Sequence, residues 1–559
     1  MGMLSFVPLF SFAALYLYAH EISPANEAKQ HALFLMQQTK VEEAFDRYRE
    51  YLDLAHAHDY DVLQQMGLIL LQKGVHSDDP QTFLMSLFGA GISGSTGALE
   101  ILEKGLFFPD PQVQQLSLHF IAQFEDNRSH ELLNRAMSSD YLSTRMEAAY
   151  YMSERKHPHA VGQIEGLMVR LPPAFKPYFP PFFALIGTSD ATAVLKRLLE
   201  DIDPQVRIES ILNIGRLGRD DFLPVLRKRL THSHIAELEA TIFAVGLLKD
   251  SASIPKLRKL ANSPTDAVRI AAVLALHRLG DRTNEKETLQ LAMQHNLFAI
   301  AALSEIPGFE NELAQLVNSP DLQVRLNAAI ALLRLRDPRC LGPLIEILVQ
   351  DTRDLAVQPF ASIGRTIVAF KAVPSAELRT KDPTIDLGYS MALKEQFLRE
   401  AIHLPETDFV QLARHLMIRG QNALIPTLIV LLENLRTDDA VGVLEEGVKM
   451  VGAPLIRDYC HLALYRLGKT EADYINRWVM RQKDADLIRL RPMLPWKYRL
   501  DESEHALSPE ETSKLLVDAF TAIANRRDQA SIAFLLEAIQ LGNPQNRYAL
   551  IGLLLRATE

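Results

Sequence analysis

The sequence predicts an all-α fold in which short pairs of helices stack into a long solenoid. The first observation is the stretch Asp203–Gly218, DPQVRIESILNIGRLG, which is typical of a surface turn followed by an amphipathic helix that stops at glycine. The second is a constant interval, the one from Val206 to Glu237, which we call the repeat period. Steps of one period in either direction from Val206 reach Thr82, Val113, Thr144, Phe175, Glu237, Val268 and Ala299. The third is a small residue nine positions after nearly every marker, at Gly91, Ala122, Ser153, Ala184, Gly215, Gly246 and Gly308, with His277 as the exception. A fixed period of this size indicates repeats that bury their apolar faces only by stacking on one another.

Each repeat is expected to hold two antiparallel helices. Asp203 can accept hydrogen bonds from the free N–H groups of the first turn, and Pro204 lacks an N–H where none is needed. Apolar side chains then recur at helical spacing, and Gly218 can take the left-handed conformation that ends a helix. A second short helix follows, with apolar positions at Leu223, Val225, Leu226 and Leu230.

This unit resembles a HEAT repeat, in particular the short form found in phycobilin lyases and their relatives. The residues that carry the resemblance are Asp203, Pro204, Val206, Arg207, Gly215 and Gly218. They recur as Asp266, Val268, Arg269 and Gly280, and as Asp321, Val324 and Arg325. The resemblance implies a right-handed α-α superhelix, a HEAT-type solenoid, in which Asp and Arg side chains of successive units form a ladder. It therefore implies a structural role for Arg207, Arg269 and Arg325.

The N-terminal segment, up to residue 78, is predicted to hold an export signal and a cap. Met1–Ala19 is an apolar run that is too short for a comfortable membrane span but suits a signal peptide cleaved near Ala19. An uncleaved anchor and a buried first helix are the alternatives. Residues 20–78 loosely resemble a tetratricopeptide (TPR) helix pair, and we expect them to form a small TPR-like N-terminal cap.

Residues 79–365 are predicted to form the regular array, but one unit breaks the pattern. In Leu171–Phe183, LPPAFKPYFPPFF, two prolines fall where a helix interior is expected, and proline there costs about 3 kcal/mol. We expect the helix to start late, near Pro181, after an extended segment. This exposes or repacks five aromatic residues, which either fill a bend in the solenoid or form a candidate partner-binding patch. They are Phe175, Tyr178, Phe179, Phe182 and Phe183.

Residues 366–559 are predicted to form an irregular, HEAT-like helical array. Just before it, the marker Leu355 precedes Gly364 by nine positions, so a further repeat is expected there, followed by a long polar loop at Val373–Tyr389. Helices are expected at Ser390–His403, Asp408–Arg419, Leu424–Leu435 and Asp439–Val451. After a break at Leu487–His505, the residues Asn543–Arg547 are expected to begin a last half unit that caps the stack.

Composition narrows the class of protein. A chain of 559 residues exceeds an ordinary single core, but a solenoid grows in one dimension and 48% hydrophobic residues supply a continuous core. The net charge of −10 disfavours non-specific nucleic-acid binding, which needs a basic surface. The two cysteines, Cys340 and Cys460, are interpreted as buried small hydrophobes, and they leave the cellular compartment undecided.

No motif of an enzyme or of a metal site stands out. Gly89–Gly94 matches GxGxxG, but the run before it is typical of a helix, so we interpret it as an inter-helix turn. Three His-x-His pairs cannot share a helix face, and we interpret them as surface or capping residues. The pairs are His56/His58, His157/His159 and His232/His234. We therefore predict no catalytic residue, no cofactor and no metal.

The leading hypothesis is a non-enzymatic scaffold or adaptor that binds a protein or peptide on the concave face of the solenoid. Export would place it in a bacterial periplasm or outside the cell, with the cytoplasm as the alternative. A membrane is expected as a partner only through an uncleaved N-terminal segment. The resemblance to phycobilin lyases implies a second hypothesis, a bilin or tetrapyrrole lyase or cofactor chaperone. A nucleic-acid-binding HEAT-like protein is the third, and the acidic charge opposes it.

Overall fold

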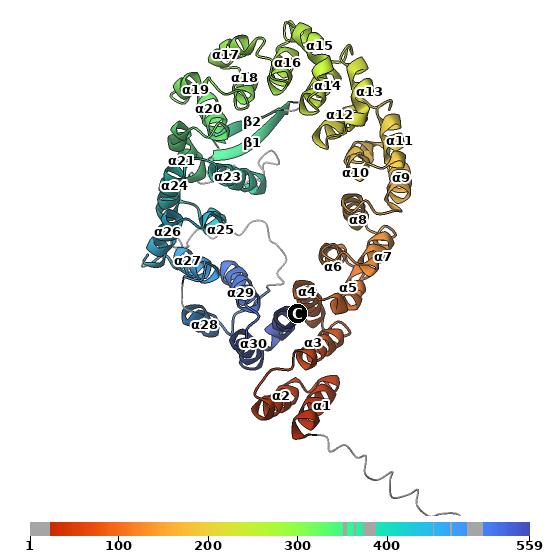
Figure 1. Cartoon of the computed structure of the whole chain (residues 1–559), viewed down its shortest axis with the longest axis vertical. Helices are drawn as coiled ribbons and strands as arrows, with labels where there is room; N and C mark the ends of the chain where they lie inside the picture. Colours follow the sequence, from red (N-terminus) through yellow and green to blue (C-terminus); the bar gives the residue numbers. More distant parts are fainter. Residues whose placement is uncertain are drawn as a thin grey trace, which may run out of the picture. The chain divides into compact units, whose positions relative to one another are not determined.

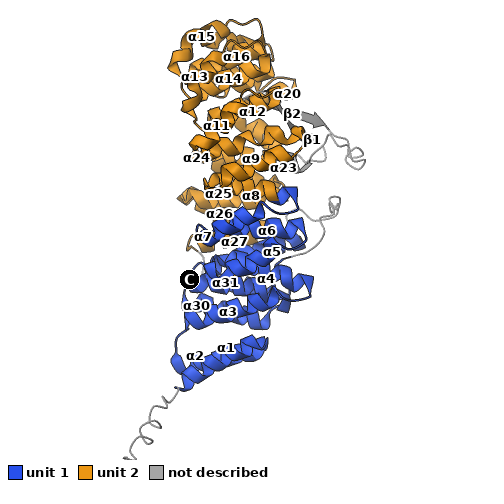
Figure 2. Ribbon diagram, turned by 90° about the vertical axis from the view of Figure 1, so that its right-hand side faces the viewer, with its two compact units in different colours: residues 1–144, 476–495, 509–559 blue, residues 145–475, 496–508 orange. Residues whose placement is uncertain are grey.

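The computed structural model describes residues 23–349, 355–362, 365–372, 387–450, 452–469, 472–488 and 507–559. Apart from one two-stranded hairpin these residues form helices and their connections, and the α-α superhelix is confirmed. The chain divides into two compact units (Figure 2): unit 1 holds residues 1–144, 476–495 and 509–559, and unit 2 holds residues 145–475 and 496–508. Among the described helices, none combines the length and the apolar composition that crossing a bilayer requires.

The helices of unit 2 form two layers, and in the inner layer each helix from α10 onward packs against the next one (Figure 1). The inner layer comprises α8 (Leu142–Glu154), α10 (Pro180–Ile186), α12 (Pro204–Arg216), α14 (Ile235–Leu247), α16 (Asp266–Arg278), α18 (Leu297–Leu303), α20 (Leu322–Arg334), α23 (Leu387–Ala401), α25 (Ile425–Leu435) and α27 (Pro454–Arg466). The outer layer comprises α9 (Ala160–Arg170), α11 (Ser189–Leu198), α13 (Leu223–Arg229), α15 (Ile254–Leu260), α17 (Glu285–Met293), α19 (Glu310–Leu316), α21 (Leu341–Val349), α24 (Glu406–Arg419) and α26 (Asp438–Val448). The last helix, α28 (Ala472–Arg481), continues into unit 1.

The inner helices begin and end as the repeat pattern predicts. Asp203 accepts a hydrogen bond from the N–H of Gln205 at 2.8 Å, which satisfies a free donor of the first turn of α12. At the other end Gly218 has a φ of 69°, and the N–H of Arg219 donates to the carbonyl of Ile214. Left-handed residues occupy this slot once per repeat period, at Lys156, Gly187, Gly218, Lys249 and Gly280.

Lys156 and Lys249 are the members of this series that carry a side chain, and the φ of 53° at Lys249 is costly for a residue with a Cβ. We expect Lys249→Gly to raise the free energy of unfolding by about 1 kcal/mol, since it removes this strain. Urea unfolding followed by far-UV circular dichroism measures the change. Lys249→Ala is the control and should leave stability nearly unchanged, because alanine keeps the strain; equal stabilisation by both substitutions would refute the argument.

The small-residue slot lets the inner helices approach closely. A Cβ added to Gly215 would lie 2.7 Å from the Cα of Ala244 on α14. One added to Gly246 would lie 2.9 Å from the Cα of Ala275 on α16. Both separations are too short for real atoms, so the slot has to stay small for α12, α14 and α16 to stack.

The repeat arginines form ion pairs, but only Arg207 of the three reaches the next unit. Arg207 donates from Nε to the Glu237 carboxylate of the next unit at 2.9 Å, and Arg325 pairs with Glu346 at 3.3 Å. Arg269 pairs with Asp266 of its own unit, one helical turn away. These ion pairs fit the structural role predicted for the three arginines, whereas the predicted ladder of Asp and Arg between successive units is wrong for all of them.

A second series of ion pairs follows the period more strictly. Arg227 of α13 binds Asp250 through two hydrogen bonds of 2.9 and 2.6 Å, and Asp250 ends the next repeat's inner helix. Arg258 of α15 contacts Asp281 at 2.7 Å, with both residues displaced by one repeat period. Each pair joins an outer helix to the turn of the following unit, so these ion pairs hold neighbouring units together.

Unit 1 is built from both ends of the chain. Its N-terminal helices are α1 (Pro24–Gln37), α2 (Val41–Ala55), α3 (Tyr60–Gly74), α4 (Pro80–Ser93), α5 (Leu99–Leu106), α6 (Pro111–Ile121) and α7 (Asn127–Ala136), and its C-terminal helices are α29 (Pro509–Ala524), α30 (Gln529–Leu541) and α31 (Arg547–Thr558). Helix α31 packs against α3 and α4. The two separate caps that the sequence predicts are therefore wrong: the last helix completes the core of the N-terminal segment.

Glycines make this packing possible. A Cβ on Gly552 of α31 would lie 2.7 Å from the carbonyl carbon of Gly89 on α4, so the two backbones touch. Gly89 belongs to the GxGxxG sequence, where the turn interpretation holds only for Gly94, which ends α4 with a φ of 73°. Hydrogen bonds also join the N-terminal helices to α31, for example from the side-chain amide of Gln64 to the backbone carbonyl of Thr558 at 3.0 Å.

The repeat expected at Leu355 is absent. Instead β1 (Leu355–Ser362) pairs antiparallel with β2 (Arg365–Ala372), in a register that runs from Leu355 opposite Ala372 to Ser362 opposite Arg365. β-branched and aromatic residues in these runs favour strands, and the two residues between them suffice for a hairpin. The regular array therefore ends before residue 355, and β2 lies against α18 and α20. Most of the predicted loop Val373–Tyr389 and of the break Leu487–His505 falls outside the described residues.

Candidate protein-binding surface

The proline-aromatic segment was the strongest sequence candidate for a binding patch. Its helix α10 starts at Pro180, close to the predicted position, but the preceding residues form a 3-10 helix (Pro173–Tyr178), and the predicted extended segment is wrong. An ion pair between Lys176 and Asp201 fastens this 3-10 helix to the turn that precedes α12. Compact local helix satisfies backbone groups that an extended chain would leave unpaired.

The five aromatic residues separate into two groups. Phe179 and Phe183 are fully buried and Phe182 is 8% exposed, so these three fill the core of the bend. Tyr178 is 63% exposed, and its ring centroid lies 6.4 Å from that of the half-buried Phe175. The patch is thus reduced to Phe175 and Tyr178, because the other rings have no surface to offer a partner.

A longer apolar surface follows the inner layer. On α12 the positions that point away from the outer layer are Gln205, Glu209, Leu212 and Arg216, which share one helix face, whereas Ile211 lies on the buried face. The slot of Leu212 recurs once per repeat period and carries apolar side chains along five inner helices. We name these residues the inner-face stripe: Tyr150, Pro181, Leu212, Phe243 and Leu274.

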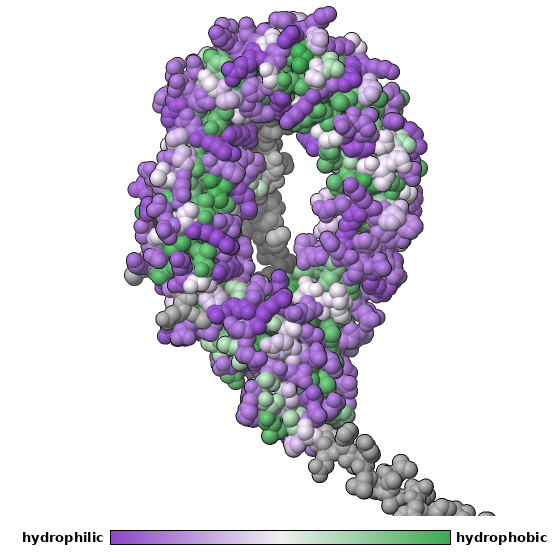
Figure 3. All heavy atoms as spheres, in the orientation of Figure 1, coloured by the Kyte–Doolittle hydropathy of each residue, from purple (hydrophilic) through white to green (hydrophobic). Residues whose placement is uncertain are grey.

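The stripe is partly exposed and lies among small side chains. Tyr150 is 46% exposed and Phe243 is half-buried, whereas Leu212 and Leu274 are only 6% and 3% exposed and form the floor. The neighbouring slots on α14 and α16 hold only alanine, at Ala236, Ala240, Ala267 and Ala271. Apolar residues also show between hydrophilic ones along the visible face of unit 2 (Figure 3). Beside Phe243 and Leu274, these slots of α14 and α16 therefore carry only small apolar side chains, of which Ala240 and Ala271 are buried.

Arginines border the stripe at the C-terminal ends of the inner helices. Arg278 of α16 binds Glu305 with two hydrogen bonds of 2.9 and 2.8 Å, and its guanidinium lies 5.0 Å from the ring centroid of Phe243. It therefore touches both neighbouring inner helices. Arg334 of α20 pairs in the same manner with Glu400 of α23 at 3.4 Å.

Arg216 occupies the same slot on α12 and is exposed, but within the described part of the chain it forms no ion pair. Glu305 follows its partner Arg278 by a fixed number of residues. The residue that follows Arg216 by the same number is Phe243, so a phenylalanine stands where the equivalent glutamate would be. This surface was not among the sites predicted from the sequence, although the repeat period applied to the exposed face of α12 indicates it.

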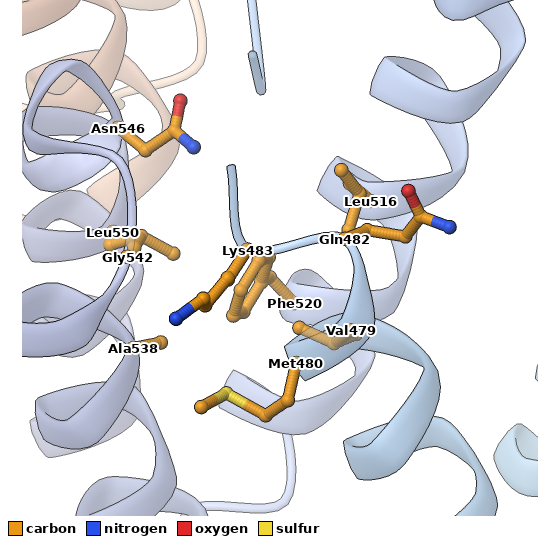
Figure 4. A pocket seen from close by; sticks show the side chains of 10 residues that line it. All are labelled: Val479, Met480, Gln482, Lys483, Leu516, Phe520, Ala538, Gly542, Asn546 and Leu550. Carbon is orange, nitrogen blue, oxygen red and sulfur yellow. The ribbon is translucent and has the colours of Figure 1, made fainter. Parts of the chain in front are cut away.

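Two cavities among the described residues do not offer a comparable site. In unit 1 a groove of about 570 Å³ is lined by Phe107 and by Glu103, whose carboxylate is shared by Arg128 and Arg135. Its charges thus neutralise one another. A second gap, between α28, α29, α30 and α31, measures about 10 Å³ and has room for one water molecule at most (Figure 4).

The cysteines and histidines considered for catalysis or metal binding are buried or make structural contacts. Burial raises the pKa of Cys340 and of Cys460 to about 12, so neither cysteine supplies a thiolate near neutral pH. His234 accepts the N–H of Glu237 and so caps α14, and His58 contacts the hydroxyl of Tyr48 at 3.2 Å. No cluster of three or more potential metal ligands occurs among the described residues.

Comparison with known proteins gives only distant likenesses. No family model matches the sequence, and no curated protein matches it. Among solved structures it is similar to the complex of CpcE and CpcF of phycocyanin lyase from a Nostoc species, at 19% identity over 37% of this chain and 87% of that one, with a TM-score of 0.28. It is also similar to the karyopherin Kap121p, at 12% identity over 94% of this chain and 58% of that one (TM-score 0.36), and to UNC-45 from Drosophila melanogaster, at 14% identity over 95% and 87% (TM-score 0.32). Its own helix pairs, which recur at a constant period and stack in two layers, make the chain a helical repeat protein with a solenoid fold.

Proposed function

We propose that the chain is a non-enzymatic scaffold that binds a protein or peptide on the inner face of unit 2. The observation that carries the proposal is the inner-face stripe, an apolar slot repeated at the period of the fold along five inner helices. Repeat arrays use such surfaces to hold extended or helical partners.

Apolar burial favours this surface over the outer helix α13. Covering an exposed aromatic or aliphatic side chain contributes roughly 1.5–3 kcal/mol, and Tyr150 and Phe243 both retain exposed area. The alanines beside them let a partner's backbone come close without displacing long side chains. On the outer helix α13, by contrast, the exposed positions include Arg227 and Lys228, which favour water.

We also propose that the protein is exported, as the apolar run Met1–Ala19 suggests. These residues lie outside the described part of the chain. The partner would then belong to the same compartment. The mass of the protein isolated from its native cells tests this proposal: loss of the first residues supports export, and an intact N-terminus in the cytoplasm refutes it.

Photo-crosslinking tests the binding surface. Benzoylphenylalanine is placed at Tyr150 or Phe243 on the inner face, and at Lys228 of α13 as the matched outer control. In the cells that make the protein, we expect ultraviolet light to give heavier adducts from the two inner positions and not from position 228. Equal adducts at all three positions, or adducts from position 228 alone, would contradict the proposal.

A further inference from the structure

We infer that Arg216 receives the side-chain carboxylate of an Asp or Glu that lies among apolar residues of a bound peptide. This inference rests on the proposed function and adds the chemistry of the partner. It concerns the part of the inner-face stripe formed by α12 and α14.

Three other arginines occupy positions equivalent to that of Arg216. Arg278, Arg334 and Arg466 all stand at the ends of inner helices, and each pairs with a glutamate of another inner helix or of the turn that follows it. Their partners are Glu305 at 2.8 Å, Glu400 at 3.4 Å and Glu433 at 3.5 Å. Arg216 has the same position and no such partner among the described residues. The pattern of the fold thus provides a carboxylate for three of these cations and leaves the fourth to solvent.

Apolar residues occupy the neighbouring slots around Arg216. Along the inner layer its slot is flanked by Leu185 on one side and Leu247 on the other, each one repeat period away. The position that would supply a glutamate holds Phe243. An exposed guanidinium beside apolar side chains keeps its planar donors free for a carboxylate, which it can bind with two parallel hydrogen bonds.

Two carboxylates near Arg216 are already engaged by other side chains. Asp221, just beyond the end of α12, binds Arg219 through hydrogen bonds of 2.9 and 2.8 Å. Glu209 lies two helical turns before Arg216 and accepts a hydrogen bond from Gln205 at 3.1 Å. A partner with an acidic group therefore completes at Arg216 the ion pair that the chain itself completes at Arg278.

Peptide display on phage tests this directly. Random linear peptides, displayed without a free C-terminus, are selected against the full chain, against Arg216→Glu and against the control Lys228→Glu, which makes the same change of charge on α13. We expect wild type and Lys228→Glu to enrich peptides with Asp or Glu next to apolar residues. Arg216→Glu should instead enrich Lys or Arg at that place. An identical consensus for all three proteins, or a wild-type consensus without acidic residues, would overturn the inference.

Affinity measurements sharpen the test. The best peptide is synthesised with an amidated C-terminus, together with a twin in which its acidic residue is replaced by the corresponding amide. We expect the twin to bind wild type about tenfold more weakly, the loss of one charge-assisted contact, and to bind Arg216→Gln no more weakly than the acidic peptide does. If instead the twin loses affinity equally for both proteins, the carboxylate is bound elsewhere.

A further variant separates the two proposals. Phe243→Asp places a charge on the stripe itself. If peptides bind equally well to Phe243→Asp and to wild type, the inner face is not the binding surface and the proposed function fails. If Phe243→Asp abolishes binding while Arg216→Glu leaves the consensus unchanged, the surface stands and only the carboxylate contact fails.

Discussion

Replacing Gly552 by leucine is expected to disrupt unit 1. A Cβ at this position would lie 2.7 Å from the carbonyl carbon and 2.8 Å from the Cα of Gly89, which are backbone atoms that cannot move aside as a side chain can. We expect Gly552→Leu to lower the free energy of unfolding by roughly 3 kcal/mol or more, because α31 must leave its place between α3 and α4. Urea unfolding followed by circular dichroism measures the loss, and limited proteolysis locates it.

Gly442→Leu is the matched control. Gly442 lies inside α26, and a Cβ there would meet no atom within 4 Å. Leucine is a better helix former than glycine by roughly 0.8 kcal/mol, so this variant should be as stable as wild type or more stable. If both substitutions destabilised the protein equally, the close packing of α4 on α31 would not be what limits position 552.

Removing the Glu237 carboxylate is expected to have the second large effect. This side chain is 1% exposed and receives a hydrogen bond from Arg207 at 2.9 Å, while Arg229 lies at 3.4 Å. Glu237→Ala leaves both guanidinium groups without this anion, and a buried pair broken on one side costs about 3 kcal/mol. Glu200→Ala is the control: Glu200 also pairs with Arg229, at 2.6 Å, but its side chain is 74% exposed, so the loss should stay below about 1 kcal/mol.

The same carboxylate gives a pH dependence with a definite sign. Burial alone would raise the pKa of Glu237, but the hydrogen bond and charge of Arg207, with the charges of His232 and Arg229, lower it below its ordinary value of 4.5. A lowered carboxyl pKa stabilises the fold above the unfolded-state pKa, and that contribution is lost as the pH falls below about 4.5. Between neutral pH and pH 3, wild type should therefore lose more stability than Glu237→Ala. A parallel decline of the two proteins would show that this pair does not contribute.

Much of the fold could be predicted because each repeat is determined by interactions between residues that are close in the sequence. The cap at Asp203, the helix end at Gly218 and the small slot at Gly215 are each set by residues within one unit or its neighbour. Two features could not be predicted in this manner. The packing of α31 on α4 joins Gly89 to Gly552, and no local pattern indicates which distant glycines face each other. The hairpin replaces a repeat because its residues favour strands, although the spacing of Leu355 and Gly364 satisfied the repeat template.

The candidate site was only partly predictable for a related reason. The aromatic residues of the proline-rich unit were identified correctly as unusual, but composition cannot tell an exposed ring from one that fills a bend, and Phe179 and Phe183 are buried. The residues of the inner-face stripe recur at the repeat period and so could be found in the sequence. To identify them as a surface, one needs to know only which face of each inner helix does not pack against the outer layer. The significance of Arg216 depends on its equivalents having partners, and Glu400 stands 66 residues beyond Arg334, on a helix that follows the hairpin.

Hydrogen–deuterium exchange of the full chain, with and without the tightest peptide from the display selection, tests the central claim most directly. That claim is that a partner binds the inner layer of unit 2. The account predicts slower exchange in α12, α14 and α16 on binding, with no change in the outer helices α13 and α15. Protection confined to the outer helices or to unit 1 would contradict it.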